Sequence, residues 1–334
     1  MTPPGHPAIP PAKVGVLLIN LGTPDAAEAG AVRRYLAEFL SDPRVIEIPM
    51  PLWRPILHGV ILRTRPRKSA HAYAQVWTDA GSPLAAITAE QAAALDGAFG
   101  EGVIVDWAMR YGRPAIADRI AALQTAGCER ILLAPLYPQY CAATTATAND
   151  RAFAALAKMR WQPAVRTLPP YYDDPGYVEA LRASVEASLA RLDFVPEAIV
   201  ASFHGMPQRT LELGDPYHCH CRKTARLLSD ALGRELIVAF QSRFGRARWL
   251  EPATDATLAA LPGKGMRKVA VVAPGFAADC VETLEELAIR GRETFLAAGG
   301  TDFAYLPCLN ASREGVAMLR HLLARELAGW IDAA

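Results

Sequence analysis

The sequence has no run of about 18 consecutive apolar residues, the length that a membrane-spanning helix needs. Its net charge is only +1, so it lacks the basic excess of a nucleic-acid-binding protein, and we predict no nucleic-acid partner. Six cysteines in 334 residues are too few for a disulfide scaffold, and the Pro-rich N-terminus has no apolar core of a secretory signal. We therefore expect a cytoplasmic protein with reduced thiols, in which residues 1–12 form a flexible leader.

Common nucleotide-binding and hydrolase signatures are also missing. No GxGxxG or GxxxxGK[ST] occurs, and NLGTPD (20–25) has one glycine, too few to cradle a pyrophosphate. No GxSxG nucleophile elbow is present either. Hydride transfer on a dinucleotide and serine hydrolysis are therefore disfavoured.

The sequence does contain short apolar runs that alternate with Ala- and Leu-rich helical stretches. Several of these runs are almost continuously apolar, as strands covered on both faces must be. The predicted strands are residues 14–22, 102–109, 130–138, 164–172, 197–205, 235–242, 268–276 and 302–309. This alternation predicts an α/β protein with parallel sheets and helices on both faces.

The eight predicted strands divide into two groups of four. The boundary lies near PPYYDDPG (169–176), which predicts two α/β lobes, residues 13–172 and 173–310, each with a four-stranded parallel sheet. Ligands in such folds bind at the carboxyl ends of the strands, so we expect an active-site cleft between the lobes. Residues 311–334 contain a predicted C-terminal helix, and the first lobe is one candidate surface for it.

Residues 49–68 break this pattern. The segment mixes apolar and basic side chains, namely Trp53, Ile56, Leu57, Val60, Ile61 and Leu62 with Arg54, Arg63, Arg65, Arg67 and Lys68. One interpretation is an element on a membrane surface, with apolar area to bury and attraction to anionic lipid. The other is an ordinary amphipathic helix with a solvated basic end, and the segment alone favours that one.

Polar side chains near strand ends are the candidates for chemistry. His204 in SFHGMP follows a predicted strand, although a lone histidine there also suits a turn. Glu282 and Glu286 are four residues apart, so they share one face of a helix, where acidic residues also stabilise the helix N-terminus. A carboxylate face opposite a histidine suits divalent-cation binding or proton transfer.

Other strand-end loops carry arginines, aromatic residues and hydroxyls. Arg110, Tyr140 and Trp249 are examples. Aromatic faces and arginine forks suit a large flat ligand with carboxylate arms. The alternative is that the arginines are solvated and the aromatic residues belong to the core.

Taken together, these motifs resemble ferrochelatases. The resemblance covers residues 14 to about 310 and rests on NLGTPD (20–25), GSPL (81–84), MRYGRP (109–114), LYPQY (136–140), SFHGMP (202–207), GDPY (214–217), FQSR…WLEP (240–252) and PGFAADCVETLEE (274–286). It implies the chelatase fold, with two Rossmann-like lobes related by a pseudo-twofold axis. It also implies a lyase of heme biosynthesis, which inserts Fe²⁺ into protoporphyrin IX and releases two protons. A coproporphyrin ferrochelatase, another tetrapyrrole chelatase or a non-catalytic tetrapyrrole or metal carrier are the alternatives.

The resemblance also implies roles for individual residues. His204 and Glu282 would be the catalytic pair, in contact with the metal and the pyrrole nitrogens. The porphyrin-binding residues would be Ser82, Arg110, Tyr140, Trp249, Phe276 and Asp279. Glu286 would belong to a metal or proton path, but Arg290 stands where many family members carry an acid, so the resemblance does not extend that path further.

Partners and cofactors follow from the same resemblance. Porphyrin and ferrous iron would be substrates, and residues 49–68 would form a membrane-facing lip, at the inner face of the membrane. Transient contact with neighbouring heme-pathway enzymes is a further expectation. A [2Fe–2S] cluster needs four thiolates, and its usual segments supply only Cys219 and Cys221 here, so we predict no cluster and no tightly bound cofactor.

One stretch that looks like a metal site is YHCHC (217–221). Four consecutive side chains point in opposed directions on a strand and around the full circumference of a helix, so they cannot close one tetrahedron. The stretch lies between GDPY and RKTARLLSDALG, so we predict a connecting loop without a metal.

Overall fold

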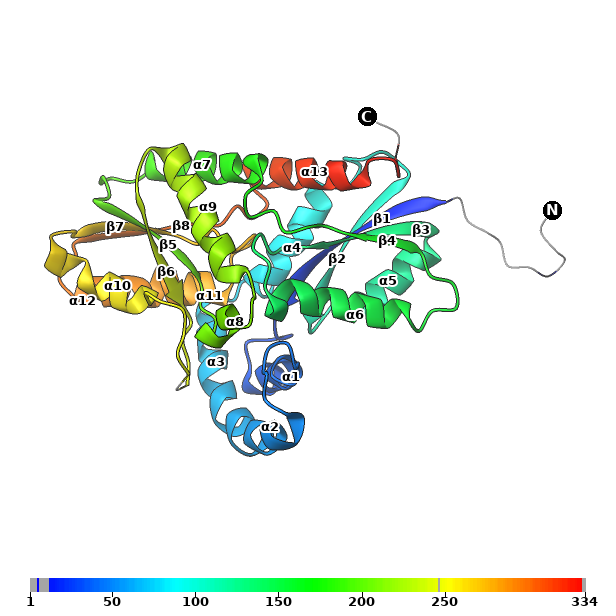
Figure 1. Cartoon of the computed structure of the whole chain (residues 1–334), viewed down its shortest axis with the longest axis horizontal. Helices are drawn as coiled ribbons and strands as arrows, with labels where there is room; N and C mark the ends of the chain where they lie inside the picture. Colours follow the sequence, from blue (N-terminus) through cyan, green and yellow to red (C-terminus); the bar gives the residue numbers. More distant parts are fainter. Residues whose placement is uncertain (1–4, 6–11, 246, 332–334) are drawn as a thin grey trace.

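The structure is a computed structural model that describes residues 5, 12–245 and 247–331. It contains two four-stranded parallel sheets, which confirms the predicted α/β fold with two Rossmann-like lobes (Figure 1). The first sheet has the order β2-β1-β3-β4, from β1 (Lys13–Gly22), β2 (Val103–Tyr111), β3 (Cys128–Pro135) and β4 (Ala164–Thr167). The second has the order β6-β5-β7-β8, from β5 (Ala198–His204), β6 (Leu236–Gln241), β7 (Lys268–Val272) and β8 (Asp302–Leu306). The second order repeats the first, as a pseudo-twofold relation requires.

Several predicted strands extend too far at their carboxyl ends. The prediction of a strand over residues 164–172 is wrong beyond Thr167. Leu168, Pro169 and Pro170 follow, and a proline has no backbone N–H to continue a ladder. The residues beyond the strands are the loops at the carboxyl edges of the sheets, where several of the candidate site residues lie.

Helices cover both faces of the two sheets. The helices of the first lobe, including three that project away from its sheet, are α1 (Ala29–Phe39), α2 (Met50–Ile56), η1 (Leu57–Ile61), α3 (Leu62–Val76), α4 (Pro83–Ala94), α5 (Ile116–Thr125), η2 (Ala142–Ala146) and α6 (Thr147–Leu156). Residues 168–174 form the link between the lobes. After this link come α7 (Pro175–Leu189), α8 (Gln208–Glu212), α9 (Tyr217–Leu232), α10 (Thr254–Ala260), η3 (Pro262–Lys264), α11 (Val281–Thr283), η4 (Leu284–Gly291), α12 (Arg292–Ala297) and α13 (Arg313–Leu327). None of the helices in the described ranges is long and apolar enough to cross a membrane.

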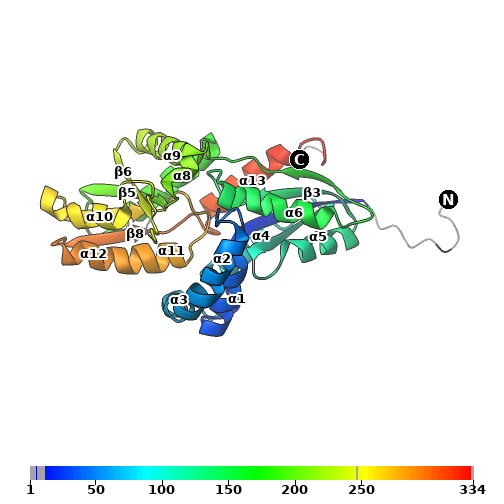
Figure 2. The same ribbon diagram turned by 60° about the horizontal axis from the view of Figure 1, so that its bottom comes forward.

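Helices α1 to α3 project from the junction of the two lobes, as Figures 1 and 2 both show. They have their own apolar core, which includes Trp53, Leu57 and Leu62. These three apolar side chains of residues 49–68 are therefore not part of an exposed surface. They point into this small core, and Trp53 Nε1 donates to the Leu40 carbonyl at 2.7 Å.

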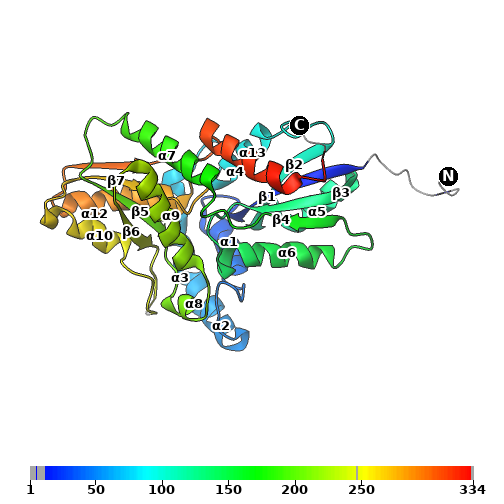
Figure 3. The same cartoon turned by 45° about the horizontal axis from the view of Figure 1, so that its top comes forward.

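The C-terminal helix α13 lies along α7, as Figure 3 shows from above. Its buried face includes Leu319, Leu322 and Leu323. It also contacts the first lobe, because the Arg166 guanidinium of β4 donates to the Glu326 carbonyl at 2.6 Å. Helix α13 thus touches both lobes and helps to fix their relative position.

The carboxyl edges of the two sheets meet. Leu84 and Met109 of the first lobe pack in one apolar cluster with Ala278 and Cys280, which follow β7 in the second. The loops that follow the strands are therefore gathered between the lobes, where parallel α/β sheets place their ligands.

Candidate active site

His204 is the last residue of β5, and its neighbour in the ladder is Gln241, the last residue of β6. The Nδ1 atom of His204 lies 2.7 Å from the carbonyl oxygen of Gly205. A carbonyl oxygen can only accept, so Nδ1 carries a proton, and in the neutral imidazole Nε2 then keeps its lone pair. The tautomer that this geometry selects is therefore the one in which Nε2 can act as a base or a metal ligand.

Gly205 lets the chain turn closely after His204. A Cβ atom at this position would lie 2.4 Å from the Gln241 carbonyl oxygen and 3.4 Å from the Trp249 ring. Trp249 therefore lies directly beside the turn that follows His204. Its Nε1 donates to the Phe244 carbonyl at 2.9 Å, which fixes the ring.

Glu282 is held next to the same strand end. The side-chain amide of Gln241 donates to the Glu282 carbonyl oxygen at 2.7 Å. Gln241 therefore links His204 and Glu282, 78 positions apart in the numbering, at one edge of the sheet.

The negative charge of Glu282 acts on buried tyrosines of the projecting helices. Burial raises the pKa of Tyr35 and Tyr73, and the negative charge of Glu282 adds to the shift. Burial likewise raises the pKa of the Cys280 thiol, again with a contribution from Glu282. These three groups therefore stay neutral near pH 7.

Glu286 does not share its environment with Glu282. Residues 284–291 form a π-helix rather than an α-helix, and the Glu286 carboxylate accepts from the Ser242 N–H at 2.7 Å and from its hydroxyl at 2.6 Å. A cavity of about 340 Å³ lies beside it. Arg290 lines this cavity too and pairs with Glu285 at 2.8 Å, with Glu286 at 3.9 Å. The carboxylates of Glu285 and Glu286 thus both pair with the Arg290 guanidinium.

Asp279, predicted to bind porphyrin, is buried and fully paired within the protein. Its Oδ1 accepts from Tyr305 at 2.6 Å and from Thr283 at 2.8 Å, while Oδ2 accepts from Asn310 at 2.7 Å. Asn310 also accepts from the Asp279 backbone N–H at 2.8 Å. These contacts fix the turn that precedes Glu282.

Three other predicted porphyrin-binding residues occupy the junction of the lobes. Ser82 is buried at the start of α4, where its hydroxyl accepts from Thr23 at 2.8 Å. Phe276 is partly buried and packs against the cluster that joins the lobes. Tyr140 is partly exposed and precedes η2. The structure brings these residues to the same junction as His204 and Glu282.

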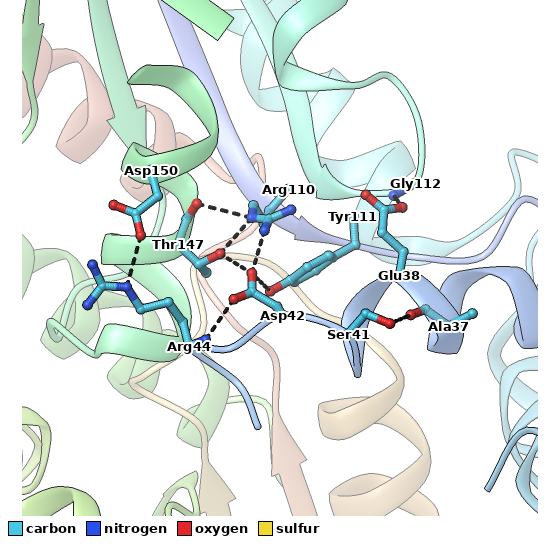
Figure 4. A network of polar contacts seen from close by, with 10 residues as sticks. All are labelled: Ala37, Glu38, Ser41, Asp42, Arg44, Arg110, Tyr111, Gly112, Thr147 and Asp150. Carbon is cyan, nitrogen blue, oxygen red and sulfur yellow. Dashed lines mark hydrogen bonds and ion pairs between the residues drawn. The ribbon is translucent and has the colours of Figure 1, made fainter. Parts of the chain in front are cut away.

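Arg110 is already paired with the protein's own carboxylate. Figure 4 shows its guanidinium on Asp42 and on the hydroxyl and carbonyl of Thr147. Its Cζ also lies 4.2 Å from the centroid of the Tyr111 ring. A porphyrin carboxylate at Arg110 would therefore compete with Asp42.

Two residues that organise the site were not selected from the sequence. Gln241 ends an apolar strand, and its isolated polar character there was a usable signal. Asp42 is 6% exposed and collects hydrogen bonds from Arg110, Tyr111 and Thr147. Only an Asp–Pro pair after a helix marks it in the sequence, and that pattern indicates a turn rather than a buried anion.

The prediction that YHCHC is a connecting loop is wrong. Helix α9 begins at Tyr217, so these residues form its first turn. Tyr217 and Cys221 continue the buried stripe of Ala225 and Leu228 at helical spacing, a period that the sequence already carried. In the described part of the chain, no three His, Cys, Asp or Glu side chains are grouped to hold a metal ion.

Comparison with known proteins decides the family. The family model described as Ferrochelatase matches residues 13–327. The chain belongs to the ferrochelatase family. A ferrochelatase of Rhizobium meliloti is 57% identical over 333 residues, with 98% of each chain covered. Ferrochelatases of Agrobacterium fabrum and Azoarcus are each 53% identical and cover 98% and 96% of this chain, and 98% and 90% of their own.

Solved chelatases share the fold of this ferrochelatase family member. SirB from Bacillus subtilis, solved with Fe³⁺, aligns with a TM-score of 0.54 at 12% identity and covers 95% of this chain and 96% of its own. A second structure, the sirohydrochlorin chelatase SirB with cobalt, has a TM-score of 0.53 at 14% identity, with 95% of each chain covered. At such identities the likeness shows the fold alone.

Proposed function

We infer that the protein is a ferrochelatase that inserts Fe²⁺ into protoporphyrin IX, a lyase reaction of heme biosynthesis. The observation that carries this inference is the arrangement of His204 and Glu282 about Gln241 at one sheet edge. The family membership supports the same reaction. Porphyrin and ferrous iron are both substrates, and neither is a resident cofactor.

The geometry suits the proton chemistry of metal insertion. Two pyrrole N–H protons must leave before four nitrogens can hold Fe²⁺, so two positive charges depart as two arrive. The Nε2 lone pair of His204 can accept one of these protons, because its Nδ1–H is committed to Gly205. Glu282 supplies a carboxylate that can pair with the arriving cation or take a proton. The porphyrin nitrogens themselves would supply the remaining metal ligands.

A side-by-side assay tests this proposal and its alternatives. Fe²⁺ insertion into protoporphyrin IX and coproporphyrin III is followed by heme absorbance. We expect turnover with protoporphyrin and a loss of at least about 100-fold in His204→Ala, with porphyrin binding retained. The exposed His71 on α3 gives the control, His71→Ala.

Each contrary outcome has a distinct meaning. Faster insertion into coproporphyrin would assign the protein to that alternative reaction. Porphyrin binding without any insertion would indicate a carrier. Full activity of His204→Ala would remove the histidine from the mechanism.

We also propose that the protein associates with the surface of the membrane, at its inner face from the cytoplasm. Leu52, Ile56 and Val60 are 66%, 45% and 55% exposed on α2 and η1, at a helical spacing of four. Ile48 is exposed beside them, and Arg54, Arg63, Arg67 and Lys68 are exposed on the same segment. Apolar area next to basic charge favours binding to anionic lipid.

We also propose that the protein holds no iron–sulfur cluster and no other tightly bound cofactor. Cys221 is buried and its thiol pKa is raised by burial, whereas Cys219 is exposed, so the two thiols do not face one site. The purified protein should show no visible iron–sulfur absorption, and a charge-transfer band near that of a cluster would contradict the proposal. Transient contacts with neighbouring heme-pathway enzymes remain a prediction.

A further inference from the structure

The YHCHC turn has a place in the fold that the proposed reaction does not explain. Its residues lie where the second lobe contacts both the first lobe and the link between the lobes. Figure 1 shows α9 on the second lobe, with the end next to α8 turned toward the first lobe. Three hydrogen bonds join residues 139–142 of the first lobe to Asp215, His220 and Thr224, in and just before the start of α9.

The bond of His220 defines its protonation state. The backbone N–H of Tyr140 donates to His220 Nδ1 at 3.2 Å. An imidazole nitrogen that accepts has no proton, so His220 is neutral and carries its proton on Nε2. Protonation at Nδ1 would place two donors face to face.

Neighbouring contacts hold the imidazole in this position. The Tyr172 ring of the interlobe link stacks on it, with centroids 3.6 Å apart and planes 8° apart. Beside His220, Asp215 accepts from the Ala142 N–H at 2.8 Å, and Gln139 donates to Thr224 at 3.0 Å. Asp215, His220 and Thr224 thus hold residues 139–142 of the first lobe by three hydrogen bonds.

We propose that this turn is a latch between the lobes, in which neutral His220 positions Tyr140 for porphyrin binding by accepting the bond of its backbone amide. The proposal deepens the proposed function and rests on it, since Tyr140 matters here as a porphyrin-binding residue. His220 is a positioning residue, because it acts through Tyr140.

The charges around His220 set the direction of its pH response. Burial lowers the pKa of His220, and the cationic Lys223 lowers it further, whereas Asp173 and Asp215 oppose the shift. The Asp173 carboxylate is itself paired with Lys223 at 2.5 Å, which weakens its effect on the imidazole. His220 is therefore neutral at pH 7, and the latch opens as the pH falls through its lowered pKa.

A pair of variants separates the hydrogen bond from the titration. His220→Asn keeps an acceptor near the position of Nδ1 and does not titrate. His220→Phe keeps a ring against Tyr172 and removes the acceptor. The matched control is His218→Asn on the same turn, because burial also lowers the pKa of His218, while its ring stacks on Phe240 within the second lobe.

Porphyrin affinity is measured by quenching of tryptophan fluorescence between pH 7.5 and pH 5, which avoids the proton steps of turnover. We expect wild type and His218→Asn to lose roughly three- to tenfold in affinity across this range, the value of one hydrogen bond. His220→Asn should keep its affinity, and His220→Phe should be weakened at every pH. The ¹³C shift of His220 Cε1 should report the same midpoint.

An identical pH dependence in wild type and His220→Asn would overturn the latch. So would full affinity of His220→Phe at pH 7.5. If these variants bind porphyrin but neither they nor wild type insert iron, the proposed function fails while the latch stands. If wild type inserts iron and the variants match it in affinity at every pH, only the latch fails.

Discussion

Replacing Asp42 tests the buried network that ties the projecting helices to the first sheet. Asp42→Ala would leave the Arg110 guanidinium, whose side chain is 13% exposed, without its anionic partner. It would also remove the acceptor for the Tyr111 hydroxyl, at 2.9 Å, and for the Arg44 N–H, at 2.8 Å. Removing one partner of a buried ion pair costs about 3–5 kcal/mol, because a buried charge is left uncompensated.

Asp42→Asn gives a smaller expected loss. The amide oxygen can still accept from Tyr111 or Thr147, so only the charge and part of the hydrogen bonding disappear. We expect about 1–3 kcal/mol of the free energy of unfolding to be lost. The control is Asp25→Ala, since Asp25 pairs with Arg34 at 3.4 Å on the surface, with side chains 53% and 69% exposed. That change should cost no more than about 1 kcal/mol.

Urea unfolding followed by tryptophan fluorescence gives the three free energies. Burial acts to raise the pKa of Asp42, but hydrogen bonds from Thr147, Arg44 and Tyr111 and the charge of Arg110 hold it below its ordinary value. This carboxylate therefore stabilises the fold above a pH of about 4, and the contribution is lost as the pH falls through the lowered pKa. Equal losses for Asp42→Ala and Asp25→Ala at pH 7 would refute the importance of the network.

Three further changes have definite expected outcomes. Replacing Leu52, Ile56 and Val60 together by Ser should weaken sedimentation with anionic vesicles about tenfold or more. The control replaces Phe153, Trp161 and Val195, which are also exposed, and should leave sedimentation unchanged. Equal binding of the two triple variants would contradict the membrane proposal. Gly22→Ala should lower the free energy of unfolding, measured by thermal unfolding, by about 3 kcal/mol or more. The φ angle of Gly22 is +118°, and an added Cβ would lie 1.9 Å from the Tyr111 carbonyl oxygen. The control Gly59→Ala should be nearly neutral, because no atom lies within 4 Å of its added Cβ. Asp279→Asn replaces one carboxylate oxygen by an NH₂ group, which would face the donor Tyr305 or Asn310. Iron insertion should therefore fall while porphyrin affinity stays unchanged. A wild-type rate would show that Asp279 does not position Glu282.

Much of the fold was predictable because its signals are local. Parallel strands buried on both faces are rich in apolar residues, and each of the eight predicted runs contains a strand in the structure. Strand ends were less predictable, since the apolar runs continue into the loops that pack between the lobes. The start of α9 was not predicted, because Tyr217 and Cys221 supply only one helical step of four residues before the longer apolar pattern of the helix begins.

The site was predictable only in part. The sequence placed His204 at the end of an apolar strand and Glu282 at the start of a helix after another, and the structure brings both to one sheet edge. The environment of Arg110 was not predictable, because the Asp42 that occupies it lies 68 residues away. The apolar side chains of residues 49–68 could not be divided into buried and exposed ones either. That division depends on where α1 and α3 pack, and Trp53 and Leu57 turn inward while Ile56 and Val60 do not.

By itself the sequence determined the eight strands, their division into two lobes and the chain positions of His204 and Glu282. Each of these depends on residues that are contiguous, so a local period or motif carries the information. Only the tertiary structure decided which polar groups meet. Gln241 reaches Glu282 over 41 residues and His220 reaches Tyr140 over 80, and both contacts depend on how the strand ends and the lobes come together. Each of these bonds pairs a side chain with a backbone group, and backbone groups are the same in almost every residue. The sequence pattern therefore cannot predict which residues pair.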